Sequence, residues 1–204
     1  MDYVAPVRAL IPGARGRILE VLGRTQEEMT LRQLGRLSGV SVNRVTALVG
    51  ELVALGIVAR RDVPPVSLVR LSADNAVAEM VRELGGLHRL VLARLKELAK
   101  GISPAPASLV VFGSFARGLA STDSDIDVLV VRGRGVRLDH DQWTESLGAW
   151  SDRAGRISGN RIALVEVGTD ELPGLRRRPL WKSVVQEGIL LAGKPLEEAA
   201  RASA

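Results

Sequence analysis

Residues 113–127 read Gly-Ser-Phe-Ala-Arg-Gly-Leu-Ala-Ser-Thr-Asp-Ser-Asp-Ile-Asp. One apolar run, Leu109 to Phe112, precedes this stretch, and a second, Val128 to Val131, follows it. The runs predict two strands, and the Gly-Ser pair predicts a turn after the first. Asp125 and Asp127 open the second strand, where residues two apart share a face. Two carboxylates on one face beside a Gly-Ser turn suit a divalent metal that bridges a triphosphate, so the stretch predicts a nucleotide site.

The whole chain has 204 residues, of which 46% are apolar, which allows one or two domains with real cores. Cysteine is absent, so disulfides and thiolate metal sites are excluded, and only two histidines are available as ligands. Residues 1–16 contain no apolar signal region, and no apolar stretch approaches the length of a membrane span. We therefore expect a cytoplasmic protein with no membrane partner.

The net charge of +5 is spread unevenly. Residues 1–71 carry ten basic and six acidic residues, whereas residues 108–204 carry thirteen of each. A basic excess in one segment indicates a polyanionic partner for that segment. Genomic base composition is the alternative cause, because arginine outnumbers lysine 24 to 4.

Three helical patterns precede two β-favouring runs in the first third of the chain. Thr30 and Ser41 can cap the second and third helices, and Gly39 lies where a tight bend between them needs positive φ. Three helices followed by a hairpin is the order of a winged helix-turn-helix. The helices are expected near residues 14–24, 30–38 and 41–55, and the strands at 57–60 and 66–71.

The segments at 31–41 and 45–58, ending Leu-Val-Ala-Leu-Gly-Ile-Val, resemble bacterial winged-helix regulators. That resemblance implies a recognition helix whose N-terminal residues face the major groove of DNA and a wing that meets phosphate. Winged helices also serve as protein-docking or dimerisation modules. The DNA-facing residues that the resemblance implies are Ser41, Asn43, Arg44 and Thr46 on the helix and Arg60 and Arg61 on the wing.

Residues 75–100 form one long helical pattern. Val77, Leu84, Val91 and Leu98 recur every seven residues, a stripe that could pair two subunits as a homodimer or pack the two domains together. The glycines at 85 and 86 interrupt the stripe, so we expect a kinked connecting helix in which His88 packs rather than binds a ligand. We divide the chain into a winged helix-turn-helix domain (1–72), a connecting helix and linker (73–104) and a C-terminal domain (105–204).

Strands and helices alternate after the linker, which predicts a small α/β sheet and an α+β class for the chain. A carboxylate pair usually needs a third acid. Glu166 interrupts an apolar strand at 161–167, on the face of Ile162 and Leu164, and we expect that strand to bring it beside Asp125 and Asp127.

An apolar strand, Gly-Ser, ten intervening residues and Asp-x-Asp resemble the minimal nucleotidyltransferases of the DNA polymerase beta superfamily. The resemblance covers about residues 108–193, including the tail Gly-Ile-Leu-Leu-Ala-Gly. It implies that Gly113 and Ser114 hold the triphosphate and that Asp125 and Asp127 bind Mg²⁺ or Mn²⁺. Glu166 matches the family's third acid only by its position on a later strand, where the family more often has Asp.

Other polar residues have two readings. Arg117 could contact phosphate or pair with Asp123 or another acid, and Lys182 could contact the triphosphate or base or remain solvated. The arginines at 176–178 could follow an RNA acceptor or form a charged loop, and we favour the loop. Trp143 and Trp150 lie seven apart on one predicted helix, which favours core packing over base stacking.

The leading hypothesis is a metal-dependent nucleotidyltransferase tethered to a DNA-binding winged helix. It would transfer NMP from an NTP to a hydroxyl of a protein, an RNA or a small molecule. One alternative is a non-enzymatic transcription regulator with a nucleotide-sensing domain, and another is an antitoxin of a toxin-antitoxin pair. The sequence leaves open which NTP, acceptor, operator and oligomeric state apply.

Overall fold

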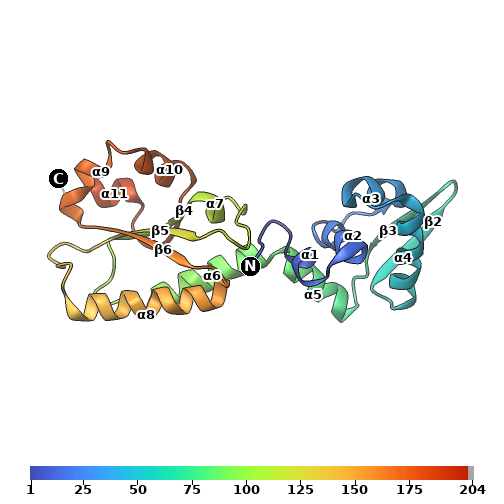
Figure 1. Ribbon diagram of the computed structural model, residues 1–204, viewed down its shortest axis with the longest axis horizontal. Coiled ribbons are helices and arrows are strands. Elements are labelled where there is room, and N and C mark those ends of the chain that lie inside the picture. The colour runs from blue at the N-terminus through green and yellow to red at the C-terminus, as the bar shows by residue number, and fades with distance from the viewer. Residues whose placement is uncertain (202–204) are drawn as a thin grey trace. The chain divides into compact units, whose positions relative to one another are not determined.

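The computed structural model describes residues 1–201 and combines helices with two small sheets (Figure 1), which confirms the α+β expectation. The chain forms two compact units. One contains Val4–Leu87 together with Asp2, and the other runs from His88 onward and also contains Met1 and Tyr3. Within residues 1–201, no helix has both the length and the apolar character needed to cross a bilayer.

The unit of residues 4–87 has the order expected for a winged helix-turn-helix. Its sheet has the order β1-β3-β2, with antiparallel pairing throughout. The two-residue strand β1 was not expected from sequence. The elements are α1 (Pro6–Leu10), α2 (Gly13–Gly23), β1 (Met29–Thr30), α3 (Leu31–Ser38), α4 (Val42–Ala54), β2 (Val58–Val63), β3 (Val66–Leu71) and α5 (Ala76–Gly85).

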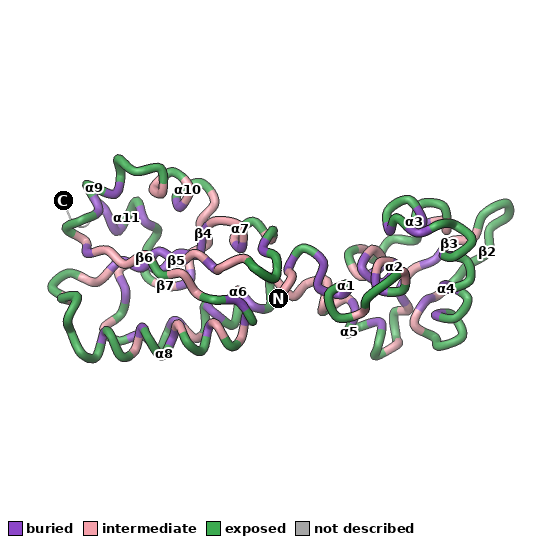
Figure 2. Tube along the Cα trace, in the orientation of Figure 1, coloured by how far each residue is buried: buried purple, intermediate pink, exposed green. Residues whose placement is uncertain are grey.

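The bend between α3 and α4 forms as the sequence predicts. Thr30 accepts a hydrogen bond from the Gln33 N–H, and the Gln33 side chain accepts one from the Thr30 N–H, which completes a capping box. Gly39 ends α3 at φ +63°, a left-handed conformation that glycine adopts without steric cost. Figure 2 shows the inward side of α4 as buried. That side carries Val45, Leu48, Val49 and Leu52 into the core of the unit.

The unit that begins at His88 is built on a four-stranded sheet of order β6-β5-β4-β7. Strands β5 and β6 are parallel, and the other neighbours are antiparallel. The elements are α6 (Leu87–Ala99), β4 (Ser108–Phe112), α7 (Gly113–Ala116), β5 (Ile126–Val131), α8 (Asp141–Ser158), β6 (Ile162–Val167), the 3-10 helix η1 (Thr169–Glu171), α9 (Leu172–Leu175), α10 (Pro179–Glu187), β7 (Ile189–Gly193) and α11 (Leu196–Arg201).

Helices cover both faces of this sheet (Figure 1). One face, which carries Phe112 and Leu129, packs against apolar residues of α9, α10 and α11. Helices α6 and α8 lie on the other side (Figure 1), and α8 turns Trp143 and Trp150 inward with at most 4% exposure. The expectation that these tryptophans pack in the core is therefore confirmed.

The expected connecting helix is two helices. Helix α5 ends at Gly85, Gly86 caps it, and α6 begins at Leu87. Three backbone carbonyls accept the Gly86 N–H, which closes α5 before the next helix starts. The division between the compact units falls at this break, between Leu87 and His88. The outer boundaries at 72/73 and 104/105 stay predictions.

Candidate functional site

The aspartate pair lies at the edge where β4 ends and β5 begins. Phe112 pairs with Asp127 in the antiparallel register of these strands, so Gly113 follows directly opposite the carboxylates. Gly113 has φ +72°, and a Cβ added to it would lie 2.5 Å from Asp127 Oδ2. Only glycine therefore lets the Asp127 carboxylate approach this turn. Asp125, two residues earlier, shares the face of Asp127.

The Gly-Ser turn after β4 leads into a very short helix. Helix α7 spans a single turn, Gly113–Ala116, and Ser114 is its second residue. The Leu119 N–H donates to the Ser114 carbonyl at 2.8 Å and closes the following loop. A helix of one turn has little macrodipole, so any affinity for phosphate depends on the local N–H groups and the Ser114 hydroxyl.

Asp125 holds an ion pair that the sequence reading missed. Arg161 Nε donates to Asp125 Oδ1 at 3.0 Å, and Arg161 Nη2 donates to Asp125 Oδ2. Arg161 directly precedes β6 and Asp125 directly precedes β5, and the parallel register places these positions side by side. The Arg161 side chain is 76% exposed, so it can leave Asp125 without losing buried contacts.

Asp127 lies in a less favourable electrostatic environment. Burial raises the pKa of Asp127 above its ordinary value, and the charge of Asp125 raises it further. No hydrogen bond from the described residues stabilises the Asp127 carboxylate. Two carboxylates lie close together on one face, and one of them is partly desolvated. A bound cation would offset both the repulsion and the desolvation.

Glu166 does not lie where the sequence led us to expect it. In the parallel register of β5 and β6, Asp127 pairs with Ala163, and Glu166 pairs with Val130. Glu166 therefore shares the face of Ile162 and Leu164, as expected, but that face is opposite to the one that carries Asp127. The expected placement of Glu166 beside the aspartates is corrected: the structure does not bring it to the pair.

Glu166 instead belongs to a partly buried polar cluster. Its Oε1 accepts hydrogen bonds from Arg132 Nη1 at 2.9 Å and Trp143 Nε1 at 2.8 Å. The Arg132 side chain is only 12% exposed and also contacts Glu171. Among residues 1–201, no group of three or more acidic or histidine side chains could hold a metal ion.

Neither of the two other nucleotide-binding candidates forms an ion pair with the aspartates among residues 1–201. Arg117 caps α7 and forms an ion pair with Glu187, the last residue of α10. Of the two readings for Arg117, the structure shows pairing with an acid other than Asp123. Lys182 lies exposed on α10 and has no ion pair among the described residues.

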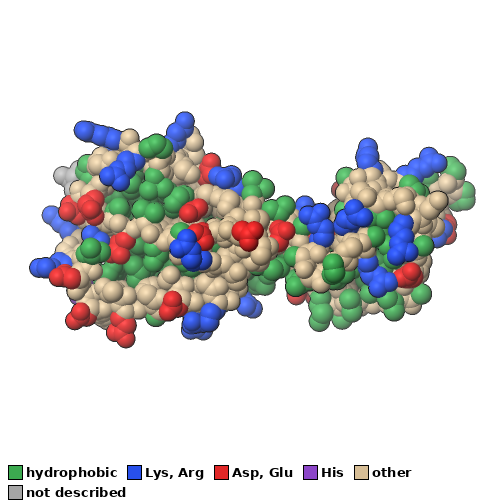
Figure 3. Space-filling view, viewed as in Figure 1, with side chains coloured by type: hydrophobic (Ala, Val, Ile, Leu, Met, Phe, Trp, Pro, Cys, Tyr) green, Lys and Arg blue, Asp and Glu red, His purple; other side chains and the backbone are tan. Residues whose placement is uncertain are grey.

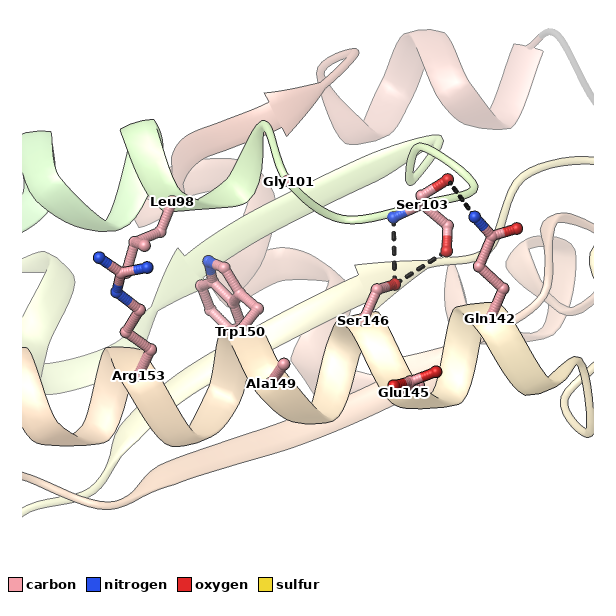
Figure 4. Close-up of a pocket in the computed structure, with 9 residues that line it drawn as sticks. All are labelled: Leu98, Gly101, Ser103, Gln142, Glu145, Ser146, Ala149, Trp150 and Arg153. Carbon is pink, nitrogen blue, oxygen red and sulfur yellow. Dashed lines mark hydrogen bonds between the residues drawn. The ribbon is translucent and has the colours of Figure 1, made fainter.

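A groove of this unit lies away from these residues. It measures about 420 Å³ and runs between the end of α6 and α8, where Ser103, Gln142 and Ser146 form a hydrogen-bonded rim (Figure 4). Trp150 and Arg153 line its other end (Figure 4). None of the candidate catalytic or nucleotide-binding residues lines it.

The candidate DNA-facing residues of α4 are exposed together. Ser41 caps the helix without a side-chain hydrogen bond, and Asn43 and Arg44 are exposed beside it. Thr46 is also exposed, although its hydroxyl donates to the Val42 carbonyl at 2.9 Å. Figure 3 shows basic side chains gathered on the visible face of this unit.

The two wing arginines point to opposite faces of β2, because they are neighbours on a strand. Arg60 bonds Asp62 and Ser67 within the wing, and Arg61 forms an ion pair with Glu28. The Arg61 hydrogen bond lowers the pKa of Glu28 below its ordinary value. The structure therefore does not place Arg60 and Arg61 on one surface.

Comparison with known families supports both halves of the chain. Residues 11–66 match the model of the MarR family, and residues 89–178 match that of the nucleotidyltransferase domain. A search of curated protein sequences finds no significant match.

Solved structures similar to this chain include a toxin-antitoxin with AMP-PNP, at 20% identity and a TM-score of 0.38. The similarity covers 55% of this chain and 82% of that one. A mutant of the toxin-antitoxin MntA-HpeT is similar at 18% identity and a TM-score of 0.38, with the same coverage. The two family matches confirm the fusion expected from the motifs: the chain joins a MarR-family winged-helix domain to a nucleotidyltransferase domain.

Proposed function

We propose that this protein transfers a nucleoside monophosphate from an NTP to a hydroxyl acceptor at the Asp125–Asp127 site. The observation that carries the proposal is the close packing of the Gly113 turn against the Asp127 carboxylate, with Asp125 on the same face. A glycine turn followed by a serine, packed against a carboxylate pair, can hold a phosphate chain through a cation.

The residues present fit a divalent cation. Asp125 and Asp127 supply hard oxygen ligands. Burial raises the pKa of Asp127, and the charge of Asp125 raises it further, so a cation would favour its ionised form. Bound Mg²⁺ or Mn²⁺ would neutralise phosphate charge and polarise the α-phosphoryl group. With only two carboxylates, the remaining ligands would come from the triphosphate and water.

The reaction itself is a substitution at the α-phosphorus. The acceptor oxygen bonds to that phosphorus, the bond to the bridging oxygen of the β-phosphate breaks, pyrophosphate leaves, and the acceptor hydroxyl loses its proton to solvent. Gly113 and Ser114 would orient the leaving phosphates. Arg161 would leave Asp125 as the cation enters.

Transfer of label from α-³²P NTPs tests the proposal, with Mg²⁺ or Mn²⁺ and with tRNA, the protein itself and proteins encoded by neighbouring genes as acceptors. We expect Asp127→Asn to lower transfer about 100-fold or more. The control is Asp139→Asn, which alters an exposed carboxylate in the loop before α8. Equal transfer by wild type and Asp127→Asn would contradict this assignment.

One observation favours a second function, nucleotide sensing without transfer. The position beside Asp127 on β6 is Ala163, and among residues 1–201 no third acid joins the two carboxylates in a group that could hold a metal ion. A two-carboxylate site could bind a metal–nucleotide complex and yet fail to activate an acceptor. Calorimetry together with analysis of the nucleotide after prolonged incubation separates the functions. A sensor binds NTP and Mg²⁺ and leaves the NTP unchanged, whereas the enzyme releases pyrophosphate.

We further propose that α4 binds DNA through Ser41, Asn43, Arg44 and Thr46, with one wing arginine, Arg60 or Arg61, at phosphate. Exposure of all four helix residues on the N-terminal half of α4 supports this. After selection of bound duplexes from a randomised library, Arg44→Ala should weaken binding about 5- to 100-fold. Arg94→Ala, an exposed arginine of α6, is the control.

A further inference from the structure

The long segment Val4–Leu87 of the winged-helix unit is joined at each end to a residue of the other unit. Tyr3 belongs to the nucleotidyltransferase unit, and Val4–Leu87 forms the winged-helix unit. The chain then re-enters the nucleotidyltransferase unit at His88. Tyr3 and His88 are therefore the residues of that unit that are bonded to the two ends of Val4–Leu87.

Both residues contact the same side chain, Phe115, which directly follows Ser114 in α7. The Tyr3 ring meets the Phe115 ring edge-on, with centroids 4.8 Å apart and an interplanar angle of 90°. The His88 ring meets it from a second side, with centroids 4.9 Å apart. Phe115 is fully buried, so a shift of its ring must displace one of these neighbours.

Hydrogen bonds fix the same contacts. His88 Nε2–H donates to the Phe115 carbonyl at 2.6 Å, because a carbonyl oxygen can only accept. The Tyr3 N–H donates to the Ala120 carbonyl at 2.9 Å, and the Tyr3 hydroxyl donates to the Ser158 carbonyl at 2.6 Å. The loop from Gly113 to Ala120 is thus held by Tyr3 at Ala120 and by His88 at Phe115.

We infer that Tyr3 and His88 are positioning residues that couple nucleotide binding at the Gly113–Ser114 turn to the winged-helix unit. The inference rests on the proposed nucleotide site. A phosphate bound at this turn restrains α7, and α7 restrains Phe115. Phe115 then restrains both covalent connections to residues 4–87. If nucleotide binding orders these two connections, part of its free energy stabilises the winged-helix unit as well.

Hydrogen–deuterium exchange of the full chain tests the coupling. The probe is the α,β-methylene analogue of whichever common NTP binds most tightly, with Mg²⁺, because its α–β linkage cannot be cleaved. In wild type, we expect the analogue to slow exchange about fivefold or more at residues 4–10 and 76–86, beyond the direct effect at residues 113–120.

The variants Tyr3→Leu and His88→Leu should weaken analogue binding and should abolish the slowing at residues 4–10 and 76–86 even at saturation. Tyr3→Phe retains the ring contact and should retain the response, and His88→Gln should give an intermediate one. Arg89→Gln, an exposed neighbour of His88, is the control and should match wild type. A merely structural role would lower thermal stability in the leucine variants without removing the response at saturation.

The outcomes separate this inference from the proposed function. If the analogue binds wild type and protects residues 113–120 while residues 4–87 do not change, the coupling is wrong and the nucleotide site stands. If both leucine variants fold and keep the full response at saturation, Tyr3 and His88 have no coupling role. If no nucleotide binds wild type in a direct calorimetric titration, the proposed function fails and the coupling fails with it.

Discussion

Asp127 and Ala163 are partners in the parallel register of β5 and β6, so the residue next to the desolvated carboxylate is an alanine. Side chains at such positions lie about 5 Å apart, within reach of one shared cation. A carboxylate at this position would complete a three-acid site on one face.

We therefore predict that Ala163→Asp raises the affinity of the protein for Mn²⁺ about tenfold, since each added carboxylate ligand tightens a hard-cation site. Calorimetric titration with Mn²⁺ alone measures this, without reference to catalysis. Ala163→Asn has nearly the same size and no charge, and it should leave the affinity close to wild type. Equal affinities for the two variants would show that position 163 does not face the cation.

Arg161 competes with a cation for Asp125 in the structure as it stands. We predict that Arg161→Gln raises Mg²⁺ affinity a few-fold, because an exposed ion pair is worth up to about 1 kcal/mol. The gain should shrink at high salt, which screens the competing pair. Arg137→Gln is a matched control, because Arg137 forms a similar two-pronged pair with Asp139. A gain in both variants would indicate a general change in net charge.

Gly113 is subject to two separate restrictions. Its φ of +72° disfavours any residue with a Cβ, and that Cβ would also meet Asp127 Oδ2 at 2.5 Å. Gly113→Ala should abolish measurable nucleotide binding and lower the free energy of unfolding by about 1–3 kcal/mol. Gly135→Ala isolates the backbone part, because Gly135 has φ +80° and open space around it. Nucleotide binding retained by Gly113→Ala would contradict the proposed phosphate turn.

The contrast between Gly113 and Glu166 shows what the sequence could predict. Strand, turn and aspartate pair lie within nineteen consecutive residues, 109–127, so local patterns fixed their arrangement. The alternation of side chains along a strand also predicted correctly that Glu166 shares the face of Ile162 and Leu164. It could not relate that face to the face of Asp127, because the two strands are separated by α8 and their register is set by tertiary packing.

The other residues missed from sequence have the same origin. Arg161 precedes its strand as Asp125 precedes its own, but only the parallel register places them side by side. Tyr3 contacts Phe115 from more than a hundred residues away in the chain, and no local pattern records such a contact. His88 was expected to pack rather than bind a ligand, and it does pack, although its partner could not be named in advance.

Glu166 should act on stability rather than on chemistry. Glu166→Gln removes the charge opposite the partly buried Arg132 and keeps an acceptor for Trp143, so we predict a loss of about 1–3 kcal/mol in the free energy of unfolding. Urea denaturation measures it. Glu171→Gln changes a more exposed, more distant partner of the same arginine and should cost less. Nucleotide binding should survive in both variants. Its selective loss in Glu166→Gln would show that Glu166 takes part in the nucleotide site.

The raised pKa of Asp127 predicts that this carboxylate lowers stability while it serves the proposed function. The folded state raises the pKa of Asp127 above the ordinary value of 3.8. The folded protein therefore binds more protons at this group than the unfolded chain does. Stability falls as the pH rises from 3.8 through the raised pKa. The penalty persists at neutral pH. Asp127→Asn should therefore raise the melting temperature at pH 7, and the gain should vanish below pH 3.8, where the carboxyl is protonated in both states. Added Mg²⁺ should stabilise wild type but not the variant, because a ligand stabilises only the state that binds it. Thermal denaturation monitored by circular dichroism measures all three, and a variant less stable than wild type at pH 7 would show that the Asp127 carboxylate has a stabilising partner.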